Sequence, residues 1–477
     1  MNKNTSKGLK KRNIAIFIFL FFLAHSSVAI EPSGTLPVLY VTTQDGAEIT
    51  SKEDYVAGDY YLVANGCAGF SDIGDSDNRP SLQIRGRGNY TWTNYEKKPF
   101  RLKLDKKADL MGTGKSKHYS LLPHCDDYYG YIRDHVGFEL SRRMGLAWTP
   151  RHEPVELVLN GDYRGIYFLT EQIKIAPNRV NITEQEDMET DPEHITGGWL
   201  LEIDNYWDDK QLHVTDSSGE ELLINITSHS PEDLSPEQFD YMYSLIYKTD
   251  SLIKVDDKTD TAWESAIDMD SLACFYIINE LMDNIEAFHG SCWMHKERGE
   301  NTKLIFGPVW DFGNAFSRGI EEQDFIYNLE GIWKEGYSTT WIKDIALFPR
   351  FQECVMRHWN AFFQAGKTDI TDFVDHFYET ILPAVAANDE RWPGLRVNLD
   401  YHTEFLRRYQ AKTDFLNERW AQNSAIDAIR DKSSGDYHVT DIMGRTLFHG
   451  STLPSTLPPG QILIIHQGDK IIKRITR

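Results

Sequence analysis

Short stretches in which apolar and polar residues alternate occupy the first third of the chain. Residues 98–104 place alternating apolar side chains on one face, with Arg101 and Lys103 on the other. Two apolar runs flank Asn160-Gly161, a dipeptide that predicts a β-hairpin. Further strand-like runs lie at residues 36–41, 58–63, 81–84 and 303–306.

Helical spacing of apolar residues begins after the first strands. Between Tyr131 and Met144 apolar residues recur every four positions, and Gly145 stands where a C-terminal cap is expected. Because strands give way to helices along the chain, we expect an α+β fold with an N-terminal β-rich part and a C-terminal helical part. The later helical patterns cover residues 235–253, 264–282, 350–366, 370–388 and 400–430.

The composition changes near residue 432. Residues 437–445 and 459–465 are short strand-like runs with a Ser/Pro/Thr segment between them. We therefore expect a small β module over residues 433–477, separate from a core over residues 30–430. An ordinary terminal hairpin is the alternative.

The first 29 residues carry the pattern of an export signal. Three consecutive cations precede an apolar run of eleven residues from Ile14 to Ala24, and Ser27-Val28-Ala29 supplies small residues for cleavage. A membrane-spanning helix needs about 20 apolar residues, so a transmembrane anchor is the poorer interpretation. We expect a secreted or cell-surface protein.

Composition narrows the possible partners and site types. The formal charge is −22, and the five Lys and Arg residues of the predicted leader bring the remainder to −22 − 5 = −27. Such an acidic chain argues against nucleic-acid binding, because phosphate contacts need clustered cations. The five cysteines are odd in number and lack a Cys-x-x-Cys pair, which predicts neither a disulfide scaffold nor a zinc module. The patterns of a P-loop, a zinc hydrolase and an α/β-hydrolase elbow are absent from the sequence.

The turn Trp310-Asp311-Phe312-Gly313 follows the strand-like run at residues 303–306. A carboxylate in such a turn is where kinase-like enzymes hold the magnesium that bridges ATP phosphates. An ordinary strand-to-loop turn gives the same tetrapeptide. The order of the upstream segments favours the kinase interpretation, because a Gly loop, a cation-bearing strand and a Glu-bearing helix precede it.

Candidate nucleotide-binding residues lie in these upstream segments. The glycines around Arg87 allow close approach of backbone to phosphate, and arginine pairs with phosphate in a bidentate way. Glu139 on the following helix is placed to pair with a strand cation, as the helix Glu does in kinases. Glu171 stands at a strand end where a hinge meets adenine. Solvated turns, strands and helix faces are the alternative for each of these residues, which are Arg87, Lys98, Arg101, Lys103, Glu139 and Glu171.

A dense polar cluster closes the apolar helix near residue 282. It contains Asp283, Glu286 and His289, candidates for a general base, a metal ligand or both. A helix C-terminus favours cations, so carboxylates gathered there need a compensating metal or partner. A solvated helix end is the alternative.

These segments together resemble the CotH kinase family, the spore-coat kinase-like proteins, and most closely its secreted members from Bacteroidetes-type bacteria. The resemblance implies an atypical protein-kinase-like fold that binds ATP with Mg²⁺ or Mn²⁺ and phosphorylates Ser or Thr of a secreted or surface protein. The matching segments are residues 85–92, 97–103, 133–145, 159–167, 170–171, 198–204 and 306–311.

The family positions assign roles and also reveal departures. By resemblance, Asp311 is the metal-binding Asp, Glu286 stands where the family carries its catalytic Asp, and Ser291 stands where kinases place a metal-ligating Asn. Asp283 is the other candidate for the catalytic position, although Phe288 would then occupy the metal-ligand position. These departures leave open a degenerate kinase fold that acts in binding or adhesion. The tail resembles a type IX secretion sorting domain at residues 441–445 and 457–465, which implies recognition by export machinery.

Overall fold

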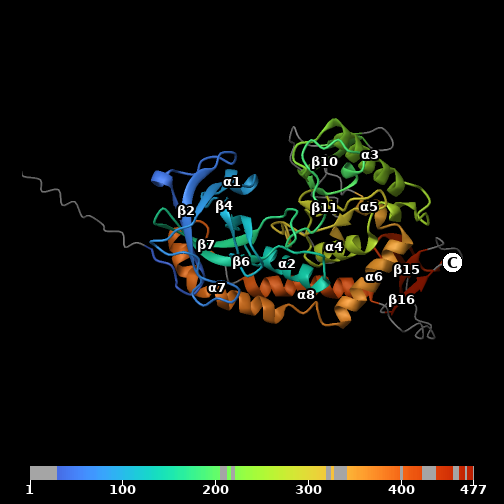
Figure 1. Cartoon of the computed structure of the whole chain (residues 1–477). Coiled ribbons are helices and arrows are strands. Elements are labelled where there is room, and N and C mark those ends of the chain that lie inside the picture. Colours follow the sequence, from blue (N-terminus) through green and yellow to red (C-terminus); the bar gives the residue numbers. More distant parts are fainter. Residues whose placement is uncertain are drawn as a thin grey trace, which may run out of the picture.

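The computed structural model describes residues 30–204, 212–215, 221–317, 324–326, 341–397, 401–421, 437–454, 461–467 and 470–475. The predicted export signal at residues 1–29 lies outside these residues, as do residues 422–430 of the last predicted helix. A mixed α/β organisation is present, with a β-rich half and a second half that contains most of the helices (Figure 1).

Seven strands of the β-rich half close into a barrel. Their order is β1-β2-β3-β4-β5-β7-β6, and the parallel pairing of β1 with β6 joins the two edges. We expected a kinase-like N-terminal sheet, so the closed barrel is a correction. The strands are β1 (Val38–Thr43), β2 (Val56–Val63), β3 (Ser81–Gly86), β4 (Phe100–Ala108), β5 (Ser116–Leu122), β6 (His152–Leu159) and β7 (Asp162–Glu171), and the short helix α1 (Tyr90–Asn94) follows β3.

The predicted alternation of apolar and polar residues along β4 is confirmed by the burial of its side chains. Leu102 and Leu104 lie in the barrel core, whereas Lys103 between them is exposed. Asn160 has a φ of 54° in the turn between β6 and β7, as expected for the predicted hairpin. In β4 the barrel interior therefore comes from every second residue, whereas β6 and β7 are buried along most of their length.

Helix α2 (Ile132–Met144) connects the barrel with the second half, because it packs against α4, α7 and β6. It ends at Gly145, whose φ is 88° and whose amide donates to the carbonyl of Ser141 at 3.0 Å, confirming the predicted cap. A Cβ on Gly137 would lie 2.3 Å from the ring of Phe312. This glycine therefore allows the turn that contains Asp311 to pack directly on α2.

The second half contains a five-stranded sheet with helices packed around it. The sheet has the order β12-β11-β8-β10-β9, from β8 (Trp199–Asp204), β9 (Leu212–Thr215), β10 (Glu221–Ser230), β11 (Cys292–Lys296) and β12 (Ile305–Phe306). Five helices agree with the predicted patterns over the described residues: α3 (Pro236–Ile253), α4 (Met269–Leu281), α6 (Pro349–Gln364), α7 (Thr371–Arg391) and α8 (His402–Trp420). The short helix α5 (Ile342–Ile345) was not predicted.

Helix α7 returns from the second half and runs beside the barrel (Figure 1). Near its end, Oδ1 of Asn388 accepts hydrogen bonds from the amide of Ile166 at 3.1 Å and from Nζ of Lys97 at 2.9 Å. Nε1 of Trp392 also donates to the carbonyl of Arg164 at 2.8 Å. A late segment of the chain therefore completes the packing of the first domain.

The tail forms the four-stranded sheet β14-β13-β15-β16, from β13 (Tyr437–Asp441), β14 (Thr446–Gly450), β15 (Ile462–Gln467) and β16 (Lys470–Ile475). Its side chains Ile442, Met443, Ile462 and Ile464 belong to the same apolar core as the helices of the second half. The sheet of the predicted tail module therefore packs against the helices of the second half. Within the described residues, no helix combines the length and the apolar character of a membrane span.

Candidate functional site

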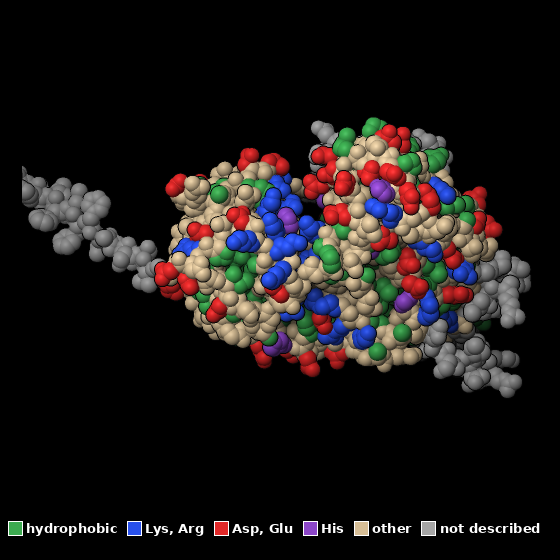
Figure 2. Space-filling view, viewed as in Figure 1, with side chains coloured by type: hydrophobic (Ala, Val, Ile, Leu, Met, Phe, Trp, Pro, Cys, Tyr) green, Lys and Arg blue, Asp and Glu red, His purple; other side chains and the backbone are tan. Residues whose placement is uncertain are grey.

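A cleft of about 940 Å³ lies between the barrel and the five-stranded sheet. Its walls come from the end of β3, from β4, from the loop before α2, from α2 itself, and from the loops that follow α4 and β12. Figure 2 shows the molecule hollowed between its two halves, with Lys and Arg side chains gathered on the barrel side. The opposite wall is lined by carboxylates.

Arginines that include Arg87 and Arg101 face the cleft from the barrel. Arg87 follows β3, and its guanidinium carbon lies 5.8 Å from the ring centre of Trp310. Burial lowers the pKa of Arg87 to about 10, and the nearby Asp311 opposes that shift. Arg101 extends from β4, and among the described residues no group accepts a hydrogen bond from its buried Nε. This wall therefore offers guanidinium donors to an anion in the cleft.

The facing wall contains Asp311 and Glu286. Asp311 has a φ of 60°, a strained value for a residue other than glycine. The side chain of Asn284 holds this turn by donating to the carbonyl of Asp311 at 3.2 Å. The side-chain amide Nδ2 of Asn314 donates a hydrogen bond to Oε2 of Glu286, and this bond orients the carboxylate of Glu286. Both acids line the same cleft.

Asp126 and Asp134 add two carboxylates to this wall. Asp126 lies in the loop before α2, and Asp134 lies in the first turn of α2. Oδ1 of Asp134 accepts from the amide of Phe312 at 3.1 Å, and Oδ2 lies 3.5 Å from Nδ1 of His124. The helix therefore presents Asp134 beside the turn that contains Asp311.

Burial, together with the crowding of these acids, raises their pKa values. Burial first and the charge of Asp311 second raise the pKa of Glu286 to about 8. The same two causes raise the pKa of Asp134 to about 8. Burial raises the pKa of Asp126 to about 6. The wall therefore contains more negative charge than the neighbouring protein groups neutralise.

Gly313 keeps open the space between two of these carboxylates. A Cβ at this position would lie 3.1 Å from Oδ1 of Asp311 and 3.3 Å from Oδ2 of Asp126. The two oxygens thus flank one small gap that any other side chain would narrow. Carboxylate oxygens with uncompensated charge are the donors that Mg²⁺ and Mn²⁺ prefer. The residues present fit a divalent cation on this wall and the phosphates of ATP on the arginine wall.

The structure brings together five of the residues predicted from sequence. Arg87, Arg101, Glu286, Ser291 and Asp311 all line the cleft. Ser291 lies between α4 and β11 and has a φ of 49°.

Asp283 lies outside the cleft lining, in the core. Its Oδ1 is 3.1 Å from Nζ of Lys412, which also lies 3.1 Å from Glu280, and all three side chains are fully buried. The acid at the end of α4 is therefore compensated by a lysine of α8.

Glu171 and Glu139 also lie outside the cleft lining. Glu171 pairs with Arg179 at 2.6 Å, so its carboxylate is held within the protein. Glu139 pairs with Arg142 and Arg143 of its own helix rather than with a strand cation.

The two predicted lysines of the barrel likewise do not line the cleft. Nζ of Lys98 donates to the carbonyl of Trp92 at 2.6 Å. Lys103 is exposed, and its Nζ lies 5.9 Å from the ring centre of Tyr55.

Sequence reasoning missed Asp126, Asp134 and Asn314. The available signal was position: Asp126 follows a strand that ends in the cleft, and Asp134 is the third residue of α2. The kinase analogy directed attention to Glu139, which lies five residues further along the same helix. Asn314 lies directly after the Asp-Phe-Gly turn, and its partner Glu286 is 28 residues away.

Comparison with known proteins agrees with this geometry. The chain matches the family described as CotH kinase protein over residues 84–421, which is more than half of its 477 residues. This range begins within β3 and ends after α8, so it includes both walls of the cleft. No curated protein matches the chain. With most of its length and both walls of the cleft inside the match, the chain belongs to the CotH kinase family.

Proposed function

We propose that the protein transfers the γ-phosphoryl group of ATP to a Ser or Thr hydroxyl of an exported protein. The observation that carries this proposal is the opposition of charge across one cleft, with Arg87 and Arg101 on one wall and a group of carboxylates that includes Glu286 and Asp311 on the other. Such a cleft suits a polyphosphate and a divalent cation together, whereas a purely basic or purely acidic groove suits one of them.

The arginines bind and orient the phosphates in this proposal. Both extend from the rigid barrel, so little reorganisation accompanies binding. A divalent cation on the opposite wall, Mg²⁺ or Mn²⁺, would supply positive charge that stabilises the phosphates during transfer. Asp311, supported by Asp126 and Asp134, would hold that ion.

Glu286 is the proposed general base. The acceptor oxygen forms a bond to the γ-phosphorus, the bond from that phosphorus to the β,γ-bridging oxygen breaks, and ADP leaves. The hydroxyl proton passes to the carboxylate of Glu286. The negative charge of Asp311 contributes to the raised pKa of Glu286, so a positive charge beside Asp311 favours the ionised form that accepts this proton.

A second candidate function is nucleotide or protein binding without transfer. The hydrogen bond from Asn314 to Glu286 favours it, because one carboxylate oxygen is already engaged by the protein. The longer side chain of Glu, where the family carries Asp, also displaces the carboxylate by about one methylene. Either function uses the same cleft, so binding and transfer need separate measurements.

Calorimetric titration with ATP and Mn²⁺, followed by a radiolabel-transfer assay, tests both candidates. We expect wild-type binding that Arg101→Ala weakens, with Lys103→Ala as the matched control from the same strand. Transfer by the wild type supports the kinase, and transfer that appears only in Glu286→Asp indicates a degraded enzyme. Absence of binding in both the wild type and Glu286→Asp rejects the proposal.

Export to the cell surface is part of the same proposal, supported by the leader pattern at residues 1–29 and the sorting-like tail. Deletion of residues 433–477 should retain the protein in the periplasm of the native host. Because the tail shares a core with the helices, the deletion should also lower the melting temperature of the purified chain. Surface display of the truncated chain at the wild-type level contradicts the sorting role.

A further inference from the structure

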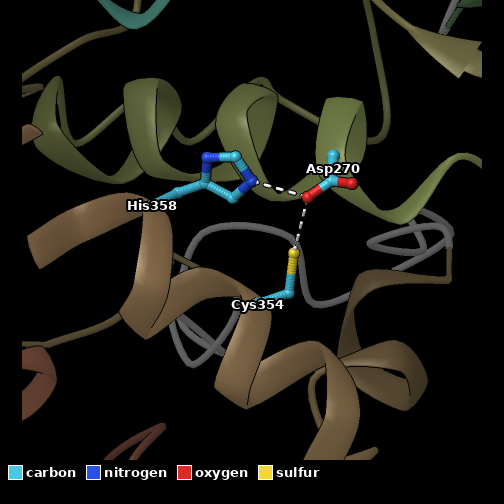
Figure 3. Close-up of side chains that lie close together, drawn as sticks. All are labelled: Asp270, Cys354 and His358. Atoms are coloured by element: carbon cyan, nitrogen blue, oxygen red, sulfur yellow. Dashed lines mark hydrogen bonds and ion pairs between the residues drawn. The ribbon is translucent and has the colours of Figure 1, made fainter. Parts of the chain in front are cut away.

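A second group of potential metal ligands lies away from the cleft, between α4 and α6. Asp270 and Cys274 are four residues apart on α4, and Cys354 and His358 are four residues apart on α6. Residues with this spacing lie on one face of a helix, so each helix directs a pair of donor groups at the other. Figure 3 shows Cys354 and His358 extending from α6 toward Asp270.

Three of these side chains converge closely. Oδ1 of Asp270 lies 2.7 Å from Nε2 of His358 and 3.4 Å from Sγ of Cys354. One ligand atom from each residue lies within 4.8 Å of the others. Tetrahedral ligands at zinc bond lengths are about 3.3–3.8 Å apart, so small adjustments would place all three around one ion.

Cys274 contacts the imidazole of His358 on the side opposite Asp270. Its Sγ lies 3.5 Å from Nδ1 of His358, the ring nitrogen that faces away from Asp270. In metal sites the second nitrogen of a ligating histidine is characteristically held by a neighbouring group, which fixes the ring and directs the first nitrogen at the ion. The contact therefore orients Nε2 of His358 toward Asp270 and Cys354.

Arg357 shows that the position attracts positive charge. Its Nη2 lies 2.5 Å from Oδ1 of Asp270 and 3.1 Å from Sγ of Cys354. The side chains of Arg357 and Asp270 are 62% and 60% exposed, so the guanidinium can turn into solvent when an ion takes its place. Cys354 is buried and His358 is partly buried, which gives the site one protected side and one open side.

We propose that Asp270, Cys354 and His358 bind Zn²⁺, with Cys274 positioning the imidazole and water completing the coordination. The mixture of thiolate, imidazole and carboxylate suits Zn²⁺ rather than the hard cations of the cleft. Binding releases the thiol proton of Cys354 and forms a sulfur–zinc bond. The ion would fasten α4 to α6, and α4 leads directly to the loop that contains Glu286.

The motif was not visible in the sequence because its halves are about 80 residues apart. The cysteines were interpreted as neither a disulfide scaffold nor a zinc module, since no two are close in the chain. Two i, i+4 pairs form a site here only because α4 packs against α6.

Titration of untagged, chelator-treated protein with Co²⁺ tests this proposal. We expect one ion per chain with a sulfur-to-cobalt charge-transfer band, and displacement of Co²⁺ by Zn²⁺. Cys354→Ser should abolish the band, and Asp270→Asn, at an exposed position, should weaken binding without disturbing the fold. Cys274→Ser should retain the band with about 10- to 100-fold weaker binding. Cys67→Ser is the matched thiol control and should behave as wild type.

Two further variants separate this site from its alternatives. Arg357→Gln removes the competing cation and should tighten Co²⁺ binding, whereas Asp311→Asn alters the cleft and should leave the band unchanged. A band that survives in Cys354→Ser, a wild type without a band, or a native disulfide between Cys274 and Cys354 detected by mass would overturn the proposal.

Discussion

Two buried acids that follow one another at the end of α4 have opposite surroundings. Asp283 and Glu280 share the ammonium group of Lys412, which is buried with them. Glu286, three residues after Asp283, lies beside Asp311 on one wall of the cleft, and burial together with the charge of Asp311 raises its pKa. Neutralisation within the protein marks a structural cluster, whereas charge left for a ligand to neutralise marks a site.

The largest effect should come from removing the lysine of the neutralised cluster. Lys412→Met leaves Glu280 and Asp283 buried without their cation, which should lower the free energy of unfolding by about 3–5 kcal/mol. Urea denaturation followed by tryptophan fluorescence measures this loss. Lys103→Met, at an exposed position, is the control, and a similar small effect of both variants would contradict the distinction between the two acids.

The corresponding change on the cleft side should cost activity rather than stability. Asp311→Asn should reduce Mn²⁺-dependent ATP binding and lower any phosphoryl transfer by more than about 100-fold. The metal-free variant should melt at or above the wild-type temperature, because the substitution removes a charge that repels Glu286 and Asp134. A marked loss of stability would place Asp311 with the structural acids.

The opposite wall allows a paired test on one strand. Arg101→Ala should weaken ATP binding by about 10-fold, since a charge-assisted hydrogen bond contributes about 1.5–3 kcal/mol. Lys103→Ala, two residues further along β4 and outside the cleft lining, should leave the affinity unchanged. Equal affinities of the two variants, measured by calorimetry, would remove the arginine wall from the nucleotide site.

An effect that needs no substitution should appear in the pH dependence of the metal-free protein. The pKa of Glu286 is raised from 4.5 to about 8, so the folded state binds this proton more tightly than the unfolded state. Stability from this group is therefore fully present below pH 4.5 and is lost as the pH rises through about 8. Asp134 should act in the same direction from 3.8 to about 8.

Melting temperatures measured across this pH range, with a chelator and with Mn²⁺, test that dependence. Mn²⁺ should flatten the decline by compensating the carboxylates, and Glu286→Gln should remove part of it. If neither Mn²⁺ nor Glu286→Gln alters the decline of the melting temperature with rising pH, groups outside the cleft cause the pH dependence.

Local patterns predicted much of the fold. The strict alternation of β4, the Asn160 turn and the Gly145 cap depend on neighbouring residues, and all three are confirmed. Barrel closure was not predicted, because it depends on pairing between β1 and β6, more than a hundred residues apart. The shared core of the tail is likewise a long-range property.

The residues of the candidate site also fall into those predicted from local motifs and those that depend on distant contacts. Glu286, Ser291 and Asp311 stand in recognisable motifs, and the structure places them in one cleft. Asp283 looked equivalent to Glu286, but Lys412 is 129 residues away in the chain and compensates only one of them. Asp134 was passed over in favour of Glu139, because helical spacing alone does not show which turn of α2 faces the cleft.

The return of α7 to the barrel has a consequence for folding kinetics. Asn388 accepts from Lys97 across 291 residues and from Ile166 across 222. The barrel sequence is synthesised long before its last hydrogen-bond acceptor, and such distant contacts slow folding through the entropy of closing large loops. Until α7 arrives, the buried ammonium of Lys97 lacks one of its acceptors. The β-rich half therefore completes its packing only after residue 388 has been synthesised.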